Sequence, residues 1–153
     1  AAGARNLDQR GERDNEAVRA AVLFTGAAVA LQQNDAKLAT AKFQQIAGDE
    51  DLAQPYRDLA LIRQTALEFD RLKPDEVIAR MDPLATAGSP WFGSAGELKA
   101  VALINQGKKQ EAGRLFPAIA NDRTVPDALR ARSVQIASTL GVDASAALSA
   151  PAQ

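Results

Sequence analysis

The stretch AKLATAKFQQIA, residues 36–47, indicates a helical fold, because its apolar side chains recur at a helical spacing. Ala39, Phe43 and Ile46 stand at positions i, i+4 and i+7, which places one small and two large side chains on one helix face. Gly48 follows, a residue type that is common just after a helix. The stretch therefore predicts an amphipathic helix whose small residue lets a paired helix approach closely, while its two large residues fill a groove.

This small–large–large pattern occurs twice more along the chain. The second set starts 38 residues after the first, at position 77, and the third starts 35 residues later, at position 112. The two sets are Val77, Met81 and Leu84, and Ala112, Phe116 and Ile119. Twelve positions before each set, where this repeat class favours a small side chain, the chain has Ala27, Thr65 and Ala100. A helical-hairpin period of about 34 residues is typical of tetratricopeptide repeats, although the consensus Trp-x-x-Leu-Gly-x-x-Tyr is absent.

Gly and Pro residues divide the chain into helical runs with apolar spacings of three and four. We expect seven helices, over residues 14–33, 36–47, 53–71, 74–86, 91–106, 109–121 and 126–140. The predicted fold is all-α: a tetratricopeptide-like right-handed solenoid of stacked antiparallel hairpins, with about three repeats and a capping helix. The predicted domain organisation is a flexible segment 1–13, a repeat domain 14–142 and a flexible Ala/Ser/Pro tail 143–153.

Composition excludes several classes of function. The formal net charge of −1 argues against a protein that binds nucleic acid or an anionic membrane through a basic surface. Because the sequence has no His and no Cys, it excludes thiol nucleophiles, imidazole bases, disulfides and zinc sites built from thiolate or imidazole ligands. The longest uncharged, mainly apolar run, residues 20–31, is far shorter than the roughly 20 residues of a spanning helix. We expect this run to be a buried core helix and the chain itself to be soluble.

Acidic and glycine-rich stretches are the remaining candidates for chemistry. The acidic stretches 49–51 and 75–76 lie at predicted helix starts, where carboxylates serve as caps and complement the helix dipole. The stretch Gly93–Gly96 lacks the Lys-Ser/Thr ending of a phosphate loop, so it indicates a tight helix entry or a close helix contact. We therefore expect no catalytic, cofactor or metal site, and an enzyme is the third-ranked interpretation.

Two groups of residues are candidates for partner binding. Arg57, Arg63, Arg130 and Arg132 lie on predicted first helices, which line the concave side of such a solenoid, and they are suited to bind carboxylates or carbonyls of a client. The alternative is that these arginines are simply solvated. Trp91 and Phe92 form an aromatic pair that suits a peptide anchor, or alternatively packs between repeats.

Three stretches resemble one known family. They are QPYRDLALIRQTALEFD (54–70), PWFGSAGE (90–97) and VPDALRARSVQIASTLGVD (125–143). They are similar to the tetratricopeptide-like family of the ancillary subunit of the Sec translocon, called YfgM-like, over roughly residues 36–143. The resemblance implies a periplasmic repeat domain at the inner membrane, with translocon subunits, a membrane-anchored prolyl isomerase and unfolded clients as partners. Members of that family have a spanning helix. We expect that this chain lacks that helix and also lacks an N-terminal portion of the family's repeat domain. The family has no catalytic residues to carry over.

The expected function is therefore a non-catalytic interaction domain, by resemblance a chaperone-like accessory of the Sec translocon at the periplasmic face of the inner membrane. Membrane attachment would come only through an anchor absent from this chain, and no nucleic acid is expected as a partner. An alternative is a tetratricopeptide adaptor in another envelope assembly, such as cell-wall synthesis or outer-membrane biogenesis. Self-association of the solenoid is a further alternative.

Overall fold

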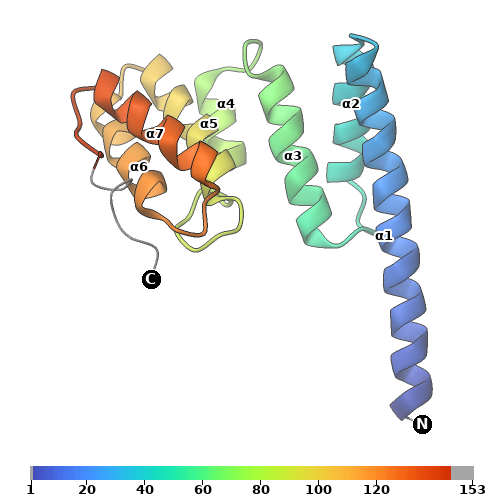
Figure 1. The fold of residues 1–153 in the computed structure, drawn as a ribbon. Helices are drawn as coiled ribbons and strands as arrows, with labels where there is room; N and C mark the ends of the chain where they lie inside the picture. Colours follow the sequence, from blue (N-terminus) through green and yellow to red (C-terminus); the bar gives the residue numbers. More distant parts are fainter. Residues whose placement is uncertain (1, 146–153) are drawn as a thin grey trace. The chain divides into compact units, whose positions relative to one another are not determined.

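A computed structural model describes residues 2–145, with side chains from residue 11 onward. Within that range the chain forms seven helices and no strand, which confirms the all-α class (Figure 1). The helices are α1 (Ala2–Gln32), α2 (Ala36–Ala47), α3 (Gln54–Glu68), α4 (Pro74–Met81), α5 (Phe92–Asn105), α6 (Lys109–Asn121) and α7 (Asp127–Thr139). Most of the predicted tail 143–153 lies outside the described residues.

The chain divides into two compact units, where the sequence predicted one repeat domain. Unit 1 comprises residues 1–68 with α1 to α3, and unit 2 comprises residues 69–153 with α4 to α7. The boundary falls between α3 and α4, which are the two helices of the middle predicted hairpin. The continuous solenoid therefore stays a prediction.

Unit 1 consists of three helices in which each packs against the next in sequence. The turn between α1 and α2 uses Asn34 at a φ of 57°, and the Asp35 carboxylate then accepts a hydrogen bond of 2.8 Å from the Leu38 N–H to cap α2. The core of the unit combines small residues on α1 with larger ones on α2, including Ala20, Ala27, Phe43 and Ile46. The first part of α1 extends past the other two helices (Figure 1).

Two helix ends differ from the sequence prediction by five residues or more. Helix α1 begins at Ala2 instead of near residue 14, since the helix continues through Gly3 and Gly11. Helix α4 ends at Met81 instead of near residue 86. The reason is Pro83, which has no N–H to donate to the Ala79 carbonyl and so interrupts the hydrogen-bond ladder, although Asp82 itself keeps a helical conformation.

In unit 2, helix α5 contacts each of the other three helices. Two glycines on α5 allow this, since a Cβ at Gly93 would lie 2.7 Å from Val125 Cγ1, and a Cβ at Gly96 would lie 2.9 Å from Ile119 Cδ1. The close helix contact expected for this stretch is confirmed. The core beneath it includes Leu103, Phe116 and other buried side chains of α5, α6 and α7.

In both units, the residues of the repeated small–large–large pattern pack in the interior. All nine residues of the three small–large–large sets are buried, and Phe116, Ile46 and Met81 are among the largest fully buried side chains. The residues 12 positions upstream, Ala27, Thr65 and Ala100, each have no exposed surface. The pattern therefore identifies the buried face of each helix correctly, although it does not by itself arrange the helices into one stack.

Candidate functional site

The most unusual surface of the described chain is an exposed apolar face on α1. Val18 is 64% exposed, Val22 is 66% exposed and Val29 is 42% exposed. Between residues 11 and 145, the other large apolar side chains that are exposed are Leu31 and Leu38, so all of them belong to α1 or the first turn of α2. Large apolar side chains gathered in this way commonly mark an interaction site. We call Val18, Val22, Thr25 and Val29 the α1 face.

The α1 face has the geometry of a helix-packing seam. Its members are separated by four, three and four residues, so they form one stripe along the helix. The surrounding residues Ala17, Ala21 and Ala28 are exposed and small, which leaves the stripe accessible to a large partner surface. The Thr25 hydroxyl donates a 2.7 Å hydrogen bond to the Ala21 carbonyl, so its methyl group remains for apolar contact.

The opposite side of α1 is already packed. Ala20, Ala27 and Ala30 are each at most 1% exposed and face the unit 1 core or its edge. We expected the run 20–31 to be a buried core helix, and this is wrong for one of its two sides. A helix with apolar residues on two opposite faces needs two neighbours, whereas unit 1 supplies a neighbour for one face. The sequence signal for the second face was the Val18, Val22 and Val29 spacing.

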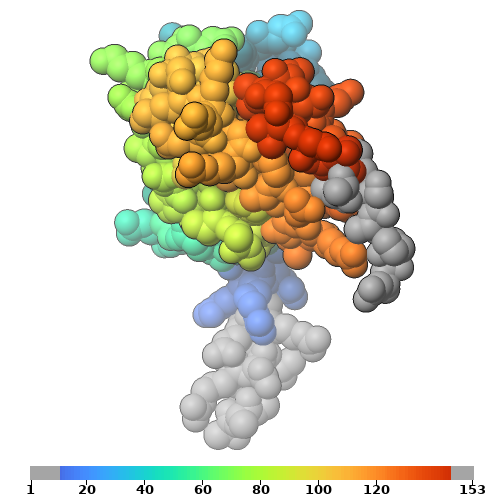
Figure 2. All heavy atoms as spheres, turned by 90° about the vertical axis from the view of Figure 1, so that its left-hand side faces the viewer, coloured from blue at the N-terminus to red at the C-terminus, as the bar shows by residue number. Residues whose placement is uncertain are grey.

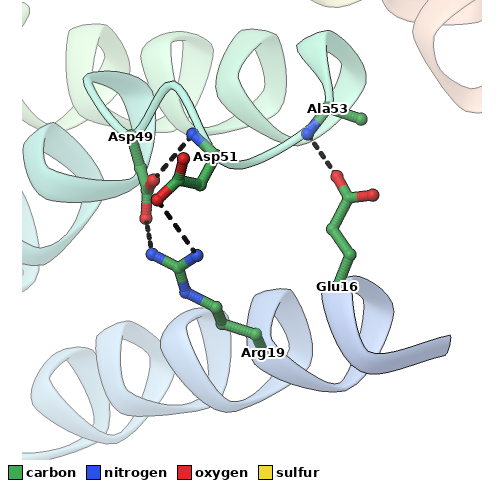
Figure 3. A network of polar contacts seen from close by, with 5 residues as sticks. All are labelled: Glu16, Arg19, Asp49, Asp51 and Ala53. Carbon is green, nitrogen blue, oxygen red and sulfur yellow. Dashed lines mark hydrogen bonds and ion pairs between the residues drawn. The ribbon is translucent and has the colours of Figure 1, made fainter. Parts of the chain in front are cut away.

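A polar network fixes α1 against the connection between α2 and α3 (Figure 3). The Arg19 guanidinium lies 2.5 Å from the Asp49 carboxylate and 3.9 Å from that of Asp51. One turn earlier on α1, the Glu16 carboxylate accepts a hydrogen bond from the Ala53 N–H. The Asp51 N–H in turn donates to Asp49 at 3.1 Å. The acidic stretch 49–51 thus holds the loop onto α1, which orients the α1 face relative to the rest of unit 1.

The four predicted arginines have different environments. In unit 1, Arg63 is exposed and makes no hydrogen bond or ion pair with the described residues, whereas Arg57 is half-buried and donates to the Gln54 side chain. In unit 2, Arg130 donates to the Ala120 carbonyl at 2.9 Å and to Asp127 at 3.1 Å. Arg132 donates twice to the Glu97 carboxylate, at 3.1 and 2.6 Å.

Both arginines of α7 are therefore bound within unit 2, Arg130 to the end of α6 and Arg132 to α5. The side chain of Arg130 is only 16% exposed, whereas that of Arg132 is 56% exposed. Of the four predicted arginines, Arg63 is the one whose guanidinium has the freest access to a partner.

The two predicted aromatic residues also separate. Phe92 is 4% exposed and packs with Ile119 and Val125, in agreement with the packing alternative. Trp91 is half-buried and precedes the first residue of α5, where its carbonyl accepts a 2.8 Å hydrogen bond from the Ala95 N–H. Of this pair, only Trp91 offers surface to a partner.

The acidic residues show local hydrogen bonding. The Thr124 hydroxyl and N–H, at 2.6 and 2.9 Å, hold the pKa of the Asp122 carboxyl below its usual value. The N–H and hydroxyl of Ser145 similarly lower the pKa of Asp143. Both carboxyls cap turns. Within the described residues, no cluster of three or more acidic side chains is close enough to hold a metal ion.

Comparisons with family models, with curated proteins and with solved structures give no match to this sequence. None of the described helices combines the length and the apolar character that crossing a membrane requires.

Proposed function

We propose that this chain is a non-catalytic protein–protein interaction domain that binds an amphipathic helix of a partner protein on the α1 face. The observation that carries the proposal is the exposure of Val18, Val22 and Val29 along one stripe of a helix whose other side is packed. Apolar stripes at this spacing accept the apolar side of a second helix, as in helix-in-groove recognition. The Glu16 and Arg19 contacts favour binding, because they hold the helix in place before the partner arrives.

The finer part of the proposal concerns the partner and the location. By resemblance of residues 54–70, 90–97 and 125–143 to the YfgM-like family, the domain serves as a chaperone-like accessory of the Sec translocon at the periplasmic face of the inner membrane. Translocon subunits, an anchored prolyl isomerase and emerging clients are the proposed partners. The two units would form parts of a tetratricopeptide-like solenoid.

Co-purification from native membranes tests this function. The tagged full chain would be compared with Val22→Glu and with the control Ala41→Glu, which adds the same charge at an exposed position of α2. We expect translocon subunits and the prolyl isomerase with the parent and the control, and their loss with Val22→Glu. Cell-wall or outer-membrane assembly proteins among the captured partners would favour the adaptor alternative instead. Equal recovery of partners with all three proteins would contradict a role for the α1 face.

A quadruple change of Arg57, Arg63, Arg130 and Arg132 to Ala tests the predicted polar surface separately. Because Arg130 and Arg132 also hold α7 to its neighbours, Arg63→Ala alone is the cleaner variant. A loss of partners with Arg63→Ala, at unchanged stability, would add Arg63 to the binding surface.

A further inference from the structure

A groove on unit 2 lies between the first turns of α6 and the segment that follows α7. Gly141, at a φ of 78°, turns the chain, and the Val142 N–H donates to the Ala137 carbonyl at 3.0 Å. The turn carries Val142 onto α6, where a Cβ at Gly113 would lie 3.2 Å from Val142 Cγ2. Figure 2 shows the start of α6, in light orange, beside this red segment.

The groove has an apolar floor and a basic rim. One part, with a volume of about 380 Å³, is lined by Lys109, Gln110, Gly113, Arg114, Leu140 and Val142. An adjoining part of about 650 Å³ shares Lys109, Gln110 and Arg114 and adds Gly107, Lys108 and Glu111. Glu111 is the single carboxylate among these lining residues, against three cationic side chains. We call this surface the α6 groove.

The cations of the α6 groove are not used within the protein. Lys108, Lys109 and Arg114 make no hydrogen bond or ion pair through their side chains with the described residues, and all three are exposed. Elsewhere in unit 2, Lys99 pairs with Asp82 at 2.5 Å and Arg132 pairs with Glu97 at 2.6 Å. Unit 2 therefore pairs some of its cations elsewhere on its surface but gathers these three around one groove.

The position of the lysines also disfavours a purely stabilising role. Lys108 is the residue before α6 and Lys109 is its first residue, where the helix dipole favours negative charge. The first turn of α4 carries Asp75 and Glu76 and that of α7 carries Asp127, whereas in α6 the acidic Glu111 follows two lysines at the helix start. Positive charge at the start of α6 thus lowers stability while it raises the local attraction for an anion.

We propose that the α6 groove binds an acidic segment of a partner protein that carries one aliphatic side chain among its acids. The carboxylates contact Lys108, Lys109 and Arg114, and the aliphatic side chain covers Gly113, Leu140 and Val142. The apolar floor distinguishes this ligand from nucleic acid or lipid phosphate, which would use the rim alone. The proposal is independent of the α1 face, which belongs to unit 1.

Fluorescence anisotropy with the full chain tests the proposal. The probe is a short labelled peptide with acidic residues on both sides of one central leucine. We expect saturable binding that weakens with salt, that is lost when the acids are replaced by their amides, and that weakens when the leucine is replaced by serine. Unchanged affinity of the serine peptide, or an equal affinity for a single-stranded oligonucleotide, would identify a general anionic attraction and overturn the proposal.

Three variants locate the site and separate it from a structural effect. Arg114→Gln should weaken binding by about threefold, whereas the matched control Arg71→Gln, an exposed cation of the same unit, should leave it unchanged. Lys109→Glu should abolish binding and at the same time raise Tm, because it places an acid at the start of α6. Equal effects of Arg114→Gln and Arg71→Gln, or binding that survives Lys109→Glu, would overturn the assignment.

Discussion

Unit 2 exposes no large apolar side chain between residues 69 and 145, whereas unit 1 exposes Val18, Val22 and Val29 on one helix. Both units bury the same small–large–large pattern, so the difference does not lie in their cores. It lies in how many faces of a helix carry apolar residues. In unit 2, α5 touches three neighbours and has its apolar sides covered, whereas α1 has a second apolar side without a described neighbour. This difference is why we propose that α1, and not a helix of unit 2, carries the partner-binding face.

The largest expected effect comes from truncating one core phenylalanine in each unit, which tests whether unit 1 is as well packed as unit 2. Phe116 has no exposed surface, and Phe43 is 5% exposed and lies with its ring 6.1 Å from that of Phe24. We expect Phe116→Ala and Phe43→Ala each to reduce the free energy of unfolding by about 3–5 kcal/mol, because each leaves a large cavity. Urea unfolding, with amide exchange to assign the loss to a unit, measures both. A much smaller loss for Phe43→Ala would mean that unit 1 is loosely packed, and the exposure of Val22 would then need no partner.

Glycine substitutions sharpen the contrast in helix packing. In unit 2, Gly93→Ala and Gly96→Ala should each cost about 1–3 kcal/mol, because the new Cβ meets Val125 or Ile119. In unit 1, Gly11→Ala meets nothing within 4 Å inside α1, and it should stabilise by about 0.5–1 kcal/mol through helix propensity. Thermal unfolding of the three variants gives the signs. Stabilisation by Gly93→Ala would contradict the close contact of α5.

The polar network of Figure 3 provides a smaller effect in unit 1. Glu16→Ala removes the acceptor of the Ala53 N–H, and we expect a loss of about 1 kcal/mol together with faster amide exchange at Ala53. Glu16→Gln retains an oxygen acceptor and should restore most of the protection. If exchange at Ala53 stayed slow in Glu16→Ala, the loop would not be held by α1.

The smallest expected effect is a pH dependence in unit 2. The pKa of Asp122 is lowered in the folded chain, so its ionised form stabilises the fold above the usual value of 3.8, and this stability is lost as the pH falls through the lowered pKa. Asp122→Asn should therefore lower Tm at neutral pH and reduce the dependence of Tm on pH below about 4. Parallel Tm curves for the two proteins across this range would contradict the assignment to Asp122.

Much of this fold is predictable because its signals are local. The Gly and Pro breaks and the apolar spacing between them predicted seven helices, and the period of Ala39, Phe43 and Ile46 with its two later copies predicted which residues are buried. Pro83 ends α4 earlier than the apolar spacing suggested. The spacing still identified Leu84 as a buried residue, although Leu84 lies beyond the end of the helix. The boundary between α3 and α4 depends on contacts between distant residues, for which the repeat period carries no information.

The candidate site was less predictable for the same reason. The run 20–31 is apolar on two sides, and sequence alone does not say which side unit 1 covers. Arg130 could be recognised as a surface cation, but its hydrogen bond to the Ala120 carbonyl depends on how α6 and α7 pack. The apolar floor of the α6 groove requires the turn at Gly141, which brings Val142 back to Gly113.

The most direct test of the central claim is photo-crosslinking from position 22 of the full chain in native membranes. A photoreactive side chain would replace Val22 in one protein and the exposed Ala41 in a control. We expect crosslinks from position 22 to translocon subunits or to the anchored prolyl isomerase, identified by mass spectrometry, and none from position 41. The same products from both positions, or no product from position 22, would contradict the claim that the α1 face binds a partner.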